Sequence, residues 1–243
     1  MKIETNTLDE IRALQEKLNS LKANLNKPLE LKQSDKPDLR IGVKKDGKKY
    51  SVRDNRDRYF YPAEWMKFYD ALTNNQKMTF DFLINTGARI NEAVNVKVGD
   101  IDLDNKRLIL RVTKVKAAKK EKAPRPRPIS ISTNFVRRLR AYIKEKNLKD
   151  ENYLGLLSRP AAHIAMKNTL KKIGIKDWYM FSLHNIRKTH GNWLKSLEID
   201  GLEICNRLGH DMNTFLKAYG SSDVFTYKDK QDMRLILGDL YAR

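Results

Sequence analysis

Cysteine is almost absent from this chain, which has only Cys205 among its 243 residues. No disulfide can therefore form within the chain, and the paired spacing of a zinc finger is missing. No apolar run approaches the ~20 residues that a bilayer-spanning helix needs. The first residues also lack the basic-then-apolar order of a secretory signal. These absences predict a soluble intracellular protein that binds neither a membrane nor a metal ion.

Acidic residues are also in short supply, with 30 Asp and Glu against 49 Lys and Arg, a net charge of +19. An excess of this size favours a polyanionic partner such as nucleic acid. Ribosomal and DNA-coating proteins share this composition, so charge alone does not indicate an enzyme. The hydrophobic fraction of 40% is sufficient for a substantial core.

The first 28 residues form the first of three predicted regions and favour a single helix over residues 7–26. Thr7 and Glu10 have the spacing of a capping box, and Pro28 marks the end. Leucine and isoleucine then recur at steps of three and four, at Ile11, Leu14, Leu18, Leu21 and Leu25. This pattern is typical of a coiled-coil seam and equally of an amphipathic helix docked on its own domain.

Residues 29–58 are predicted to be a basic linker. Between Arg40 and Arg58 the net charge is +5, and Asp46-Gly47 indicates a hairpin turn between two short strands. Either solvent or a nucleic-acid backbone would suit this charge.

Residues 59–243 are predicted to form one compact domain, mainly α-helical with a small antiparallel β-sheet. Helices are expected from Tyr61, through residues 78–84, and from near Gly87, and strands at 108–115 and 128–131. From Asn134 onward the pattern is mainly helical. A last apolar stripe, at Met233, Ile236, Leu237 and Leu240, would contact either a neighbouring protomer or its own domain.

Thr86-Gly87-Ala88-Arg89 followed by Glu92 is the first candidate for chemistry. If Gly87 opens a helix, Arg89 lies in the first turn, where the helix dipole favours an anion. Glu92 would then lie on the same face and hold the guanidinium. Taken alone, the pair would be an ordinary surface ion pair.

A second group of candidates lies towards the C-terminus. His184 and Arg187 have the i, i+3 spacing that brings two side chains to one oxyanion, and arginine suits bidentate phosphate binding. His210 follows Leu208-Gly209, and Tyr219 follows on a short predicted helix. A tyrosine becomes a useful nucleophile only where cations and acid–base groups surround it.

In this order the residues resemble the tyrosine recombinase (phage integrase) family over roughly residues 60–235. The family signature is an arginine in a TGxRxxE-like helix, a lysine on a β-hairpin, a His-x-x-Arg pair, a His or Trp after Leu-Gly, and a tyrosine shortly afterwards. The matching residues are Arg89, Lys114, His184, Arg187, His210 and Tyr219.

The resemblance implies a role for each matching residue. Arg89 and Arg187 would clamp the scissile phosphate, and Tyr219 would attack it to give a 3′-phosphotyrosyl bond and a free 5′-hydroxyl. Lys114 would protonate that leaving oxygen. The other three would support these steps: His184 in proton transfer, His210 as a donor to the phosphate, and Glu92 as a support for Arg89. No metal, ATP or other cofactor is implied.

Two of these assignments have competitors. Lys116 and Lys119 compete with Lys114 as the general acid, and Tyr227 competes with Tyr219 as the nucleophile. Residues 114–127 carry a net charge of +6. They are expected to contact the DNA backbone through Lys116, Lys119, Lys120, Lys122, Arg125 and Arg127.

The resemblance implies a site-specific recombinase, either the integrase of a mobile element or a chromosome-dimer resolvase. It would act on double-stranded DNA in the cytoplasm or nucleoid, as a dimer on one site and a tetramer in synapsis. A nicking-closing enzyme of the type IB topoisomerase kind and a non-cutting DNA-binding protein are the alternatives. Relatives carry a separate helical domain that completes a clamp around DNA, so here that clamp is expected to be reduced or supplied from elsewhere.

Overall fold

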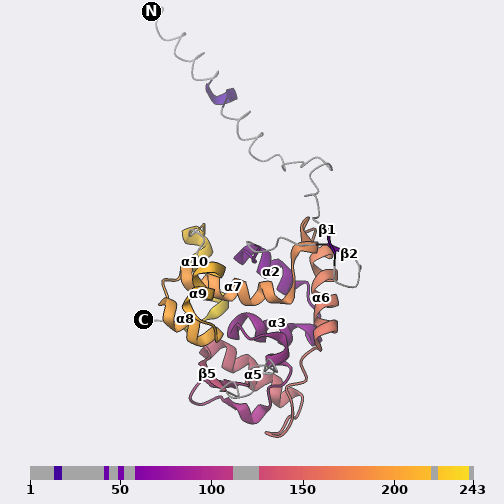
Figure 1. The fold of residues 1–243 in the computed structure, drawn as a ribbon, viewed down its shortest axis with the longest axis vertical. Helices are drawn as coiled ribbons and strands as arrows, with labels where there is room; N and C mark the ends of the chain where they lie inside the picture. Colours follow the sequence, from indigo (N-terminus) through magenta and orange to yellow (C-terminus); the bar gives the residue numbers. More distant parts are fainter. Residues whose placement is uncertain are drawn as a thin grey trace, which may run out of the picture. The chain divides into compact units, whose positions relative to one another are not determined.

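The computed structural model describes residues 14–17, 41–43, 49–51, 58–111, 126–219 and 224–240 (Figure 1). The chain divides into two compact units, residues 1–53 and residues 54–243. Each unit is considered by itself.

In the first unit, residues 14–17 are helical and exposed. They fall inside the helix expected over residues 7–26, whose other residues lie outside the described ones, as does the leucine seam apart from Leu14. Strands β1 (Ile41–Val43) and β2 (Lys49–Ser51) pair antiparallel, with Ile41 opposite Ser51. This pairing agrees with the hairpin predicted from Asp46-Gly47.

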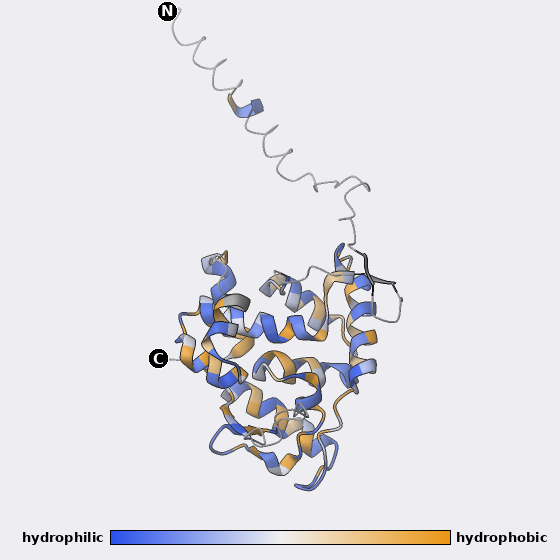
Figure 2. Ribbon diagram, viewed as in Figure 1, coloured by the Kyte–Doolittle hydropathy of each residue, from blue (hydrophilic) through white to orange (hydrophobic). Residues whose placement is uncertain are grey.

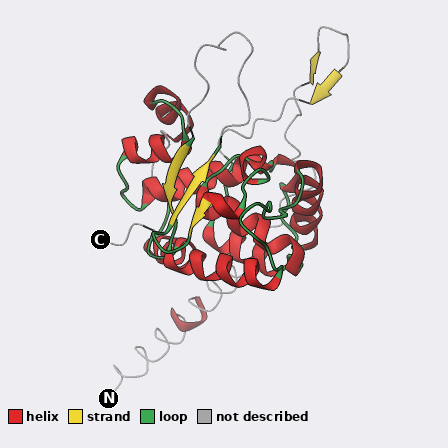
Figure 3. Ribbon diagram, turned by 90° about the horizontal axis from the view of Figure 1, so that it is seen from below, coloured by secondary structure: helices red, strands yellow, loops and turns green. Residues whose placement is uncertain are grey.

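The second unit is mainly helical, as predicted. Its helices are α2 (Pro62–Asp70), α3 (Asn74–Thr86), α4 (Ile90–Ala93), α5 (Thr133–Glu145), α6 (Arg159–Lys172), α7 (Leu183–Ser196), α8 (Gly201–Leu208), α9 (Met212–Tyr219) and α10 (Tyr227–Leu237), with 3₁₀ turns η1 (Val98–Asp100) and η3 (Trp178–Met180). Strands β3 (Ile101–Asp102), β4 (Arg107–Leu110) and β5 (Arg127–Ser130) form the predicted antiparallel sheet, in the order β3-β4-β5. Figure 3 shows these three strands beside the helices.

Helix α3 is the centre of this domain. Every residue from Met78 to Thr86 is buried, which is typical of a helix enclosed on all sides. It packs against α5, α6, α7 and α10, and Figures 1 and 2 show it in the middle of the domain with hydrophobic stretches along its length. Its buried Asp81 is held by Arg138 of α5, whose Nε lies 2.6 Å from the carboxylate.

The apolar stripe at the C-terminus packs on its own domain. Met233 and Leu237 are buried, and α10 lies against α2, α3 and α7. For these two side chains the structure therefore favours docking on the same domain over contact with a neighbouring protomer, because the core of the same domain covers them.

The helix predicted to open near Gly87 begins at Ile90 instead. Gly87 ends α3 with a φ of +64°, and its amide donates to the carbonyl of Leu83 at 2.9 Å. Glycine adopts this left-handed conformation without the strain that a Cβ atom causes, so it stops a helix here and does not start one. Arg89 is consequently the residue that precedes the short helix α4.

Candidate active site

The candidate site is built on the C-terminal ends of two helices, α3 and α8. Both helices end at a glycine with a φ of +64°, Gly87 and Gly209. The left-handed turn redirects the chain at once, so Arg89 follows the first turn and His210 the second. Each helix end leaves carbonyl groups without partners inside the helix. These carbonyls determine how the rest of the site is arranged.

Arg187 of α7 connects the two helix ends. Its Nη1 donates to the carbonyl of Gly87 at 2.9 Å, and its Nη2 donates to the carbonyl of Leu208. A cation at the negative end of a helix dipole is favourable, and here one guanidinium serves two such ends. The residue is only 2% exposed, so two of its five N–H donors fix it deep in the domain.

A second buried arginine, Arg207 of α8, braces the same region. Its Nε donates to Nε2 of His190 at 2.8 Å, and its two Nη atoms donate to the carbonyls of Asn85 and Ser130, each at 2.7 Å. Nδ1 of His190 lies 2.6 Å from the carbonyl of Ile84. These partners require the neutral tautomer that carries its proton on Nδ1. Burial, and then the charge of Arg207, lowers the pKa of His190 well below its ordinary value.

Glu92 accepts hydrogen bonds from two arginines on the other side of the site. Its carboxylate accepts from the backbone amide of Arg89 at 2.9 Å and from Arg89 Nη1 at 2.8 Å. Arg127, at the start of β5, donates Nη2 to the same carboxylate at 2.6 Å. Burial alone would raise the pKa of Glu92, but the hydrogen bonds and charge of Arg127, together with the hydrogen bonds from Arg89, lower it below its ordinary value. Glu92 is therefore an anion that holds two arginines, as the sequence predicted for Arg89 alone.

The two histidines of the predicted site lie within the field of both site arginines. Withdrawal from water lowers the pKa of His210 to about 4, and the charges of Arg187 and Arg89 add to this effect. The same causes, in the same order, lower the pKa of His184, with a further contribution from Lys188. Both imidazoles are therefore neutral at pH 7. Arg89, His184, Arg187 and His210 thus lie near one another, although they come from three separate parts of the chain.

The sequence profile of the phage integrase family matches residues 58–224 of this chain. The chain belongs to the phage integrase family. No curated protein sequence gives a significant match.

Tyrosine recombinases of known structure share the fold of this family member. The XerA recombinase superposes with a TM-score of 0.55 at 19% identity, over 73% of this chain and 64% of that one. A Tn1549 transposon integrase, in complex with transposon right end DNA, superposes with a TM-score of 0.57 at 16% identity. The match covers 79% of this chain and 69% of that one. The XerH site-specific recombinase bound to its difH substrate superposes with a TM-score of 0.53 at 17% identity. The match covers 74% of this chain and 56% of that one. The chain thus spans less than two thirds of the length of two of these three.

Several residues predicted from the integrase signature fall in a segment that is not described. These are Lys114, Lys116, Lys119, Lys120, Lys122 and Arg125, and their roles stay predictions. The ends of this segment are nevertheless fixed, because Leu110 of β4 pairs directly with Arg127 of β5. Since Arg127 contacts Glu92, the segment leaves and re-enters the sheet beside the site.

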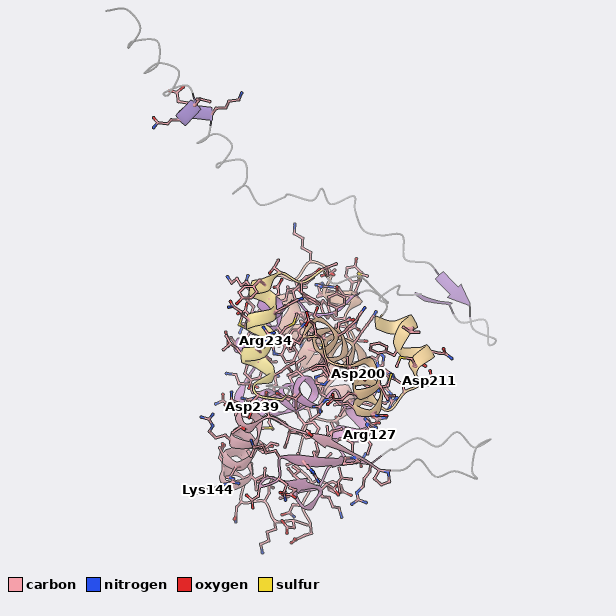
Figure 4. The ribbon with its side chains drawn as sticks, turned by 90° about the vertical axis from the view of Figure 1, so that its left-hand side faces the viewer. Arg127, Lys144, Asp200, Asp211, Arg234 and Asp239 are labelled. Carbon is pink, nitrogen blue, oxygen red and sulfur yellow. The ribbon has the colours of Figure 1, made fainter. Side chains whose placement is uncertain are left out.

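Arg127 was predicted to contact DNA, and the structure gives it another partner. Its side chain is 11% exposed and ion-paired with Glu92, whose own side chain is 1% exposed. In Figure 4 it lies on the same side of the domain as Asp200 and Asp211, whereas Lys144, Arg234 and Asp239 lie on the other side. The burial of Arg127 and its ion pair with Glu92 favour a role inside the candidate site over the predicted contact with DNA.

The two candidate tyrosines lie on different helices. Tyr219 is the last residue of α9, which packs against α7 and α8. Tyr227 is the first residue of α10 and is 74% exposed. Helix α9 therefore packs against α7, which carries His184 and Arg187, and against α8, which ends shortly before His210.

Within the described parts of the chain, no group of three or more His, Cys, Asp or Glu side chains is arranged to hold a metal ion. None of the described helices is long and apolar enough to cross a lipid bilayer.

Proposed function

We propose that this protein is a site-specific DNA recombinase that cuts and rejoins DNA through a 3′-phosphotyrosyl intermediate, with Tyr219 as the nucleophile. The observation that carries this proposal is the convergence of Arg89, Arg187, His184 and His210 around two helix ends in a member of the phage integrase family. A site of this kind offers positive charge and neutral imidazoles to one phosphate group.

The arginines stabilise charge in the proposed reaction. A phosphodiester under attack passes through a pentacoordinate state with added negative charge on its non-bridging oxygens, and preorganised donors lower the energy of that state. Arg89 and Arg187 supply guanidinium groups whose positions are set by Glu92 and by two backbone carbonyls, respectively. His210 donates a hydrogen bond to the same phosphate.

The covalent step conserves atoms and charge without a cofactor. The Tyr219 oxygen bonds to phosphorus as its proton is removed, with His184 assisting that transfer. The bond from phosphorus to the 5′-oxygen breaks, and Lys114 gives a proton to the leaving oxygen. Rejoining is the reverse reaction with a 5′-hydroxyl of either strand, so the energy of the broken bond is kept in the phosphotyrosine.

The basic segment of residues 112–125 is proposed to follow the DNA backbone next to the cut. It is attached at β4 and β5, beside the pair formed by Leu110 and Arg127. Contacts of lysine with phosphate release counterions, so affinity for DNA should fall steeply with salt and carry little sequence information. We further propose that the protein acts inside the cell as a dimer on one site and as a tetramer when two sites are joined through a Holliday junction.

Trapping of a covalent protein–DNA adduct tests this function. Duplexes are first enriched from a random-sequence pool by binding to the wild-type protein, and they are then nicked at random. Cleavage close to a nick releases a short strand and prevents rejoining, which traps the adduct. Wild type, Tyr219→Phe and Tyr227→Phe are incubated with this DNA in EDTA, quenched in detergent and separated by electrophoresis. We expect an adduct with wild type and with Tyr227→Phe, and none with Tyr219→Phe.

Other outcomes of this experiment would revise the proposal in specific ways. Loss of the adduct only in Tyr227→Phe would keep the reaction and move the nucleophile to α10. No adduct from a wild-type protein that binds the enriched DNA would contradict cleavage and leave a DNA-binding protein on this fold. Relaxation of supercoiled plasmid without strand exchange between two sites would favour a nicking-closing enzyme.

A further inference from the structure

Arg127 joins the two sides of the candidate site from a position outside the signature residues. On one side its Nη1 and Nη2 lie 3.2 and 2.6 Å from the two oxygens of Glu92. Glu92 in turn holds both the backbone amide and the guanidinium of Arg89. A two-point contact between planar groups fixes orientation as well as distance. The direction of the Arg89 side chain is therefore set through Glu92 by Arg127.

On its other side Arg127 supports the turn that carries His210. Its Nε donates to the carbonyl of Arg207 at 3.0 Å, close to the C-terminal end of α8. A Cβ atom added at Gly209 would come within 3.1 Å of Arg127 Nη1. The guanidinium thus lies directly against the Leu208-Gly209-His210 turn, and the glycine leaves room for it.

We propose that Arg127 is a positioning residue for strand cleavage, which orients Arg89 through Glu92 and supports the turn at Gly209 that carries His210. This inference rests on the function proposed above. Arg127 acts on the rate of the chemical step and makes no contact with DNA. Its guanidinium faces inward to the buried carboxylate of Glu92.

The same chemistry occurs elsewhere in the domain without a contact to any of the predicted site residues. Arg138 of α5 contacts the buried Asp81 of α3 through Nε at 2.6 Å and Nη2 at 2.9 Å. Both pairs join an arginine to a carboxylate inside the domain, and only the pair with Arg127 also holds a residue of the site. Arg138 therefore provides a matched control for the structural cost of removing an arginine from a buried acid.

A double-mutant cycle on the rate of adduct formation tests the proposal. Arg127→Ala, Glu92→Gln, the double variant and Arg138→Ala are compared with wild type on the enriched, nicked duplexes at saturating DNA. We expect Arg127→Ala and Glu92→Gln each to slow adduct formation by up to about 100-fold, the effect of misplacing a reacting group by about 1 Å. The double variant should be slowed by less than the product of the two single effects, because both changes break the connection from Arg127 through Glu92 to Arg89. Arg138→Ala should react at the wild-type rate.

Affinity for the same DNA separates positioning from contact. The slope of log Kd against log salt should be the same for Arg127→Ala and wild type, whereas loss of a phosphate contact would reduce it by about 1. The DNA concentration that gives half the maximal rate should also stay the same. Arg127→Lys should restore part of the rate, since lysine keeps the charge but cannot form the two-point contact.

Three results would overturn the inference alone, given a wild-type protein that forms the adduct. They are an unchanged rate in Arg127→Ala, effects of the two single changes that multiply in the double variant, and a reduced salt slope. Two further results, taken together, would attribute the slow rate of Arg127→Ala to a general loss of structure. They are a thermal unfolding midpoint far below that of Arg138→Ala and a rate that Arg127→Lys does not raise. Absence of an adduct with wild type would overturn the proposed function, and this inference with it.

Discussion

The end of α3 and the end of α8 are built alike and held differently. Both helices stop at a glycine with a φ of +64°, and a site residue follows each stop. At the end of α3, the carbonyls of Ile84 and Asn85 are bound by the buried side chains of His190 and Arg207. At the end of α8, arginines from outside that helix, Arg127 and Arg187, bind consecutive carbonyls.

The α3 end is therefore held by contacts within the core, whereas the α8 end is linked to the ion pairs of the site. The α3 end depends on a neutral histidine in the core and on two buried arginines, Arg187 and Arg207, so it responds to packing and to pH. The α8 end depends on Arg127, which is also paired with Glu92. Changes in the ion pairs around Arg89 should therefore alter the position of His210, while the position of the turn at Gly87 stays the same.

Removal of Arg187 should have the largest effect, because this residue binds both helix ends. Under the proposed function, Arg187→Ala slows DNA cleavage by about 10²- to 10³-fold, the usual cost of losing one oxyanion donor. It also deprives the carbonyls of Gly87 and Leu208 of this donor, which should lower the free energy of unfolding by about 1–3 kcal/mol for each. Adduct formation and urea denaturation measure the two effects.

Arg89→Ala is the matched comparison for that variant. Its rate should fall by a similar factor, but its free energy of unfolding should change by less than about 1 kcal/mol, because Arg89 is 45% exposed and Glu92 retains Arg127. Equal losses of stability in the two variants would contradict the view that Arg187 joins the two helix ends whereas Arg89 does not.

Substitution at Gly87 should have the next largest effect, on stability. A Cβ atom there would lie 2.5 Å from Cδ2 of His190 and 2.7 Å from Cδ2 of Leu208, and the φ of +64° adds strain. Gly174 has a φ of +76° with nothing within 4 Å of the added atom, so Gly174→Ala measures strain alone. Strain costs about 1–2 kcal/mol. Overpacking should make Gly87→Ala worse than Gly174→Ala by a further 1–3 kcal/mol or so in chemical denaturation. Equal losses of stability in Gly87→Ala and Gly174→Ala would mean that His190 moves to make room for the added atom.

The smallest predicted effect is a pH dependence that arises at the α3 end. His190 has a folded-state pKa well below 6.5, so the unfolded chain binds the proton more readily, and stability is lost as the pH falls below about 6.5. Between pH 6.5 and 5.5 the free energy of unfolding should fall by about 1 kcal/mol less in His190→Gln than in wild type. Denaturation curves at several pH values measure this difference. Parallel pH profiles would show that His190 does not titrate with unfolding.

Much of the fold was predictable because its signals are local. Period-3.6 apolar patterns indicated α2 and α3, and the strand-like stretch at residues 108–115 indicated β4 (Arg107–Leu110). The ordered signature around Arg89, Arg187 and Tyr219 indicated the family, which the profile over residues 58–224 confirmed. Gly87 was misjudged as a helix start because a glycine between two helical patterns suits either an end or a beginning, and only the positive φ distinguishes them.

The inner arrangement of the site was not predictable from spacing. Arg127 was grouped with its basic neighbours because charge along a sequence does not show which side chain turns inward to Glu92. Arg207 gave no signal, since its partners Ser130, Asn85 and His190 lie on three other elements. The i, i+3 spacing of His184 and Arg187 predicted one helix face, but it did not reveal that Arg187 is buried between two helix ends. Such contacts depend on tertiary packing.

The most direct test of this account is to identify the linkage in the trapped adduct. The adduct formed by wild type on end-labelled DNA is digested with trypsin, and the nucleotide-bearing peptide is sequenced by mass spectrometry. The account predicts a phosphodiester between the Tyr219 side chain and a DNA 3′ end, with a 5′-hydroxyl on the released strand. Attachment at another residue, or through a 5′ phosphate, would contradict it.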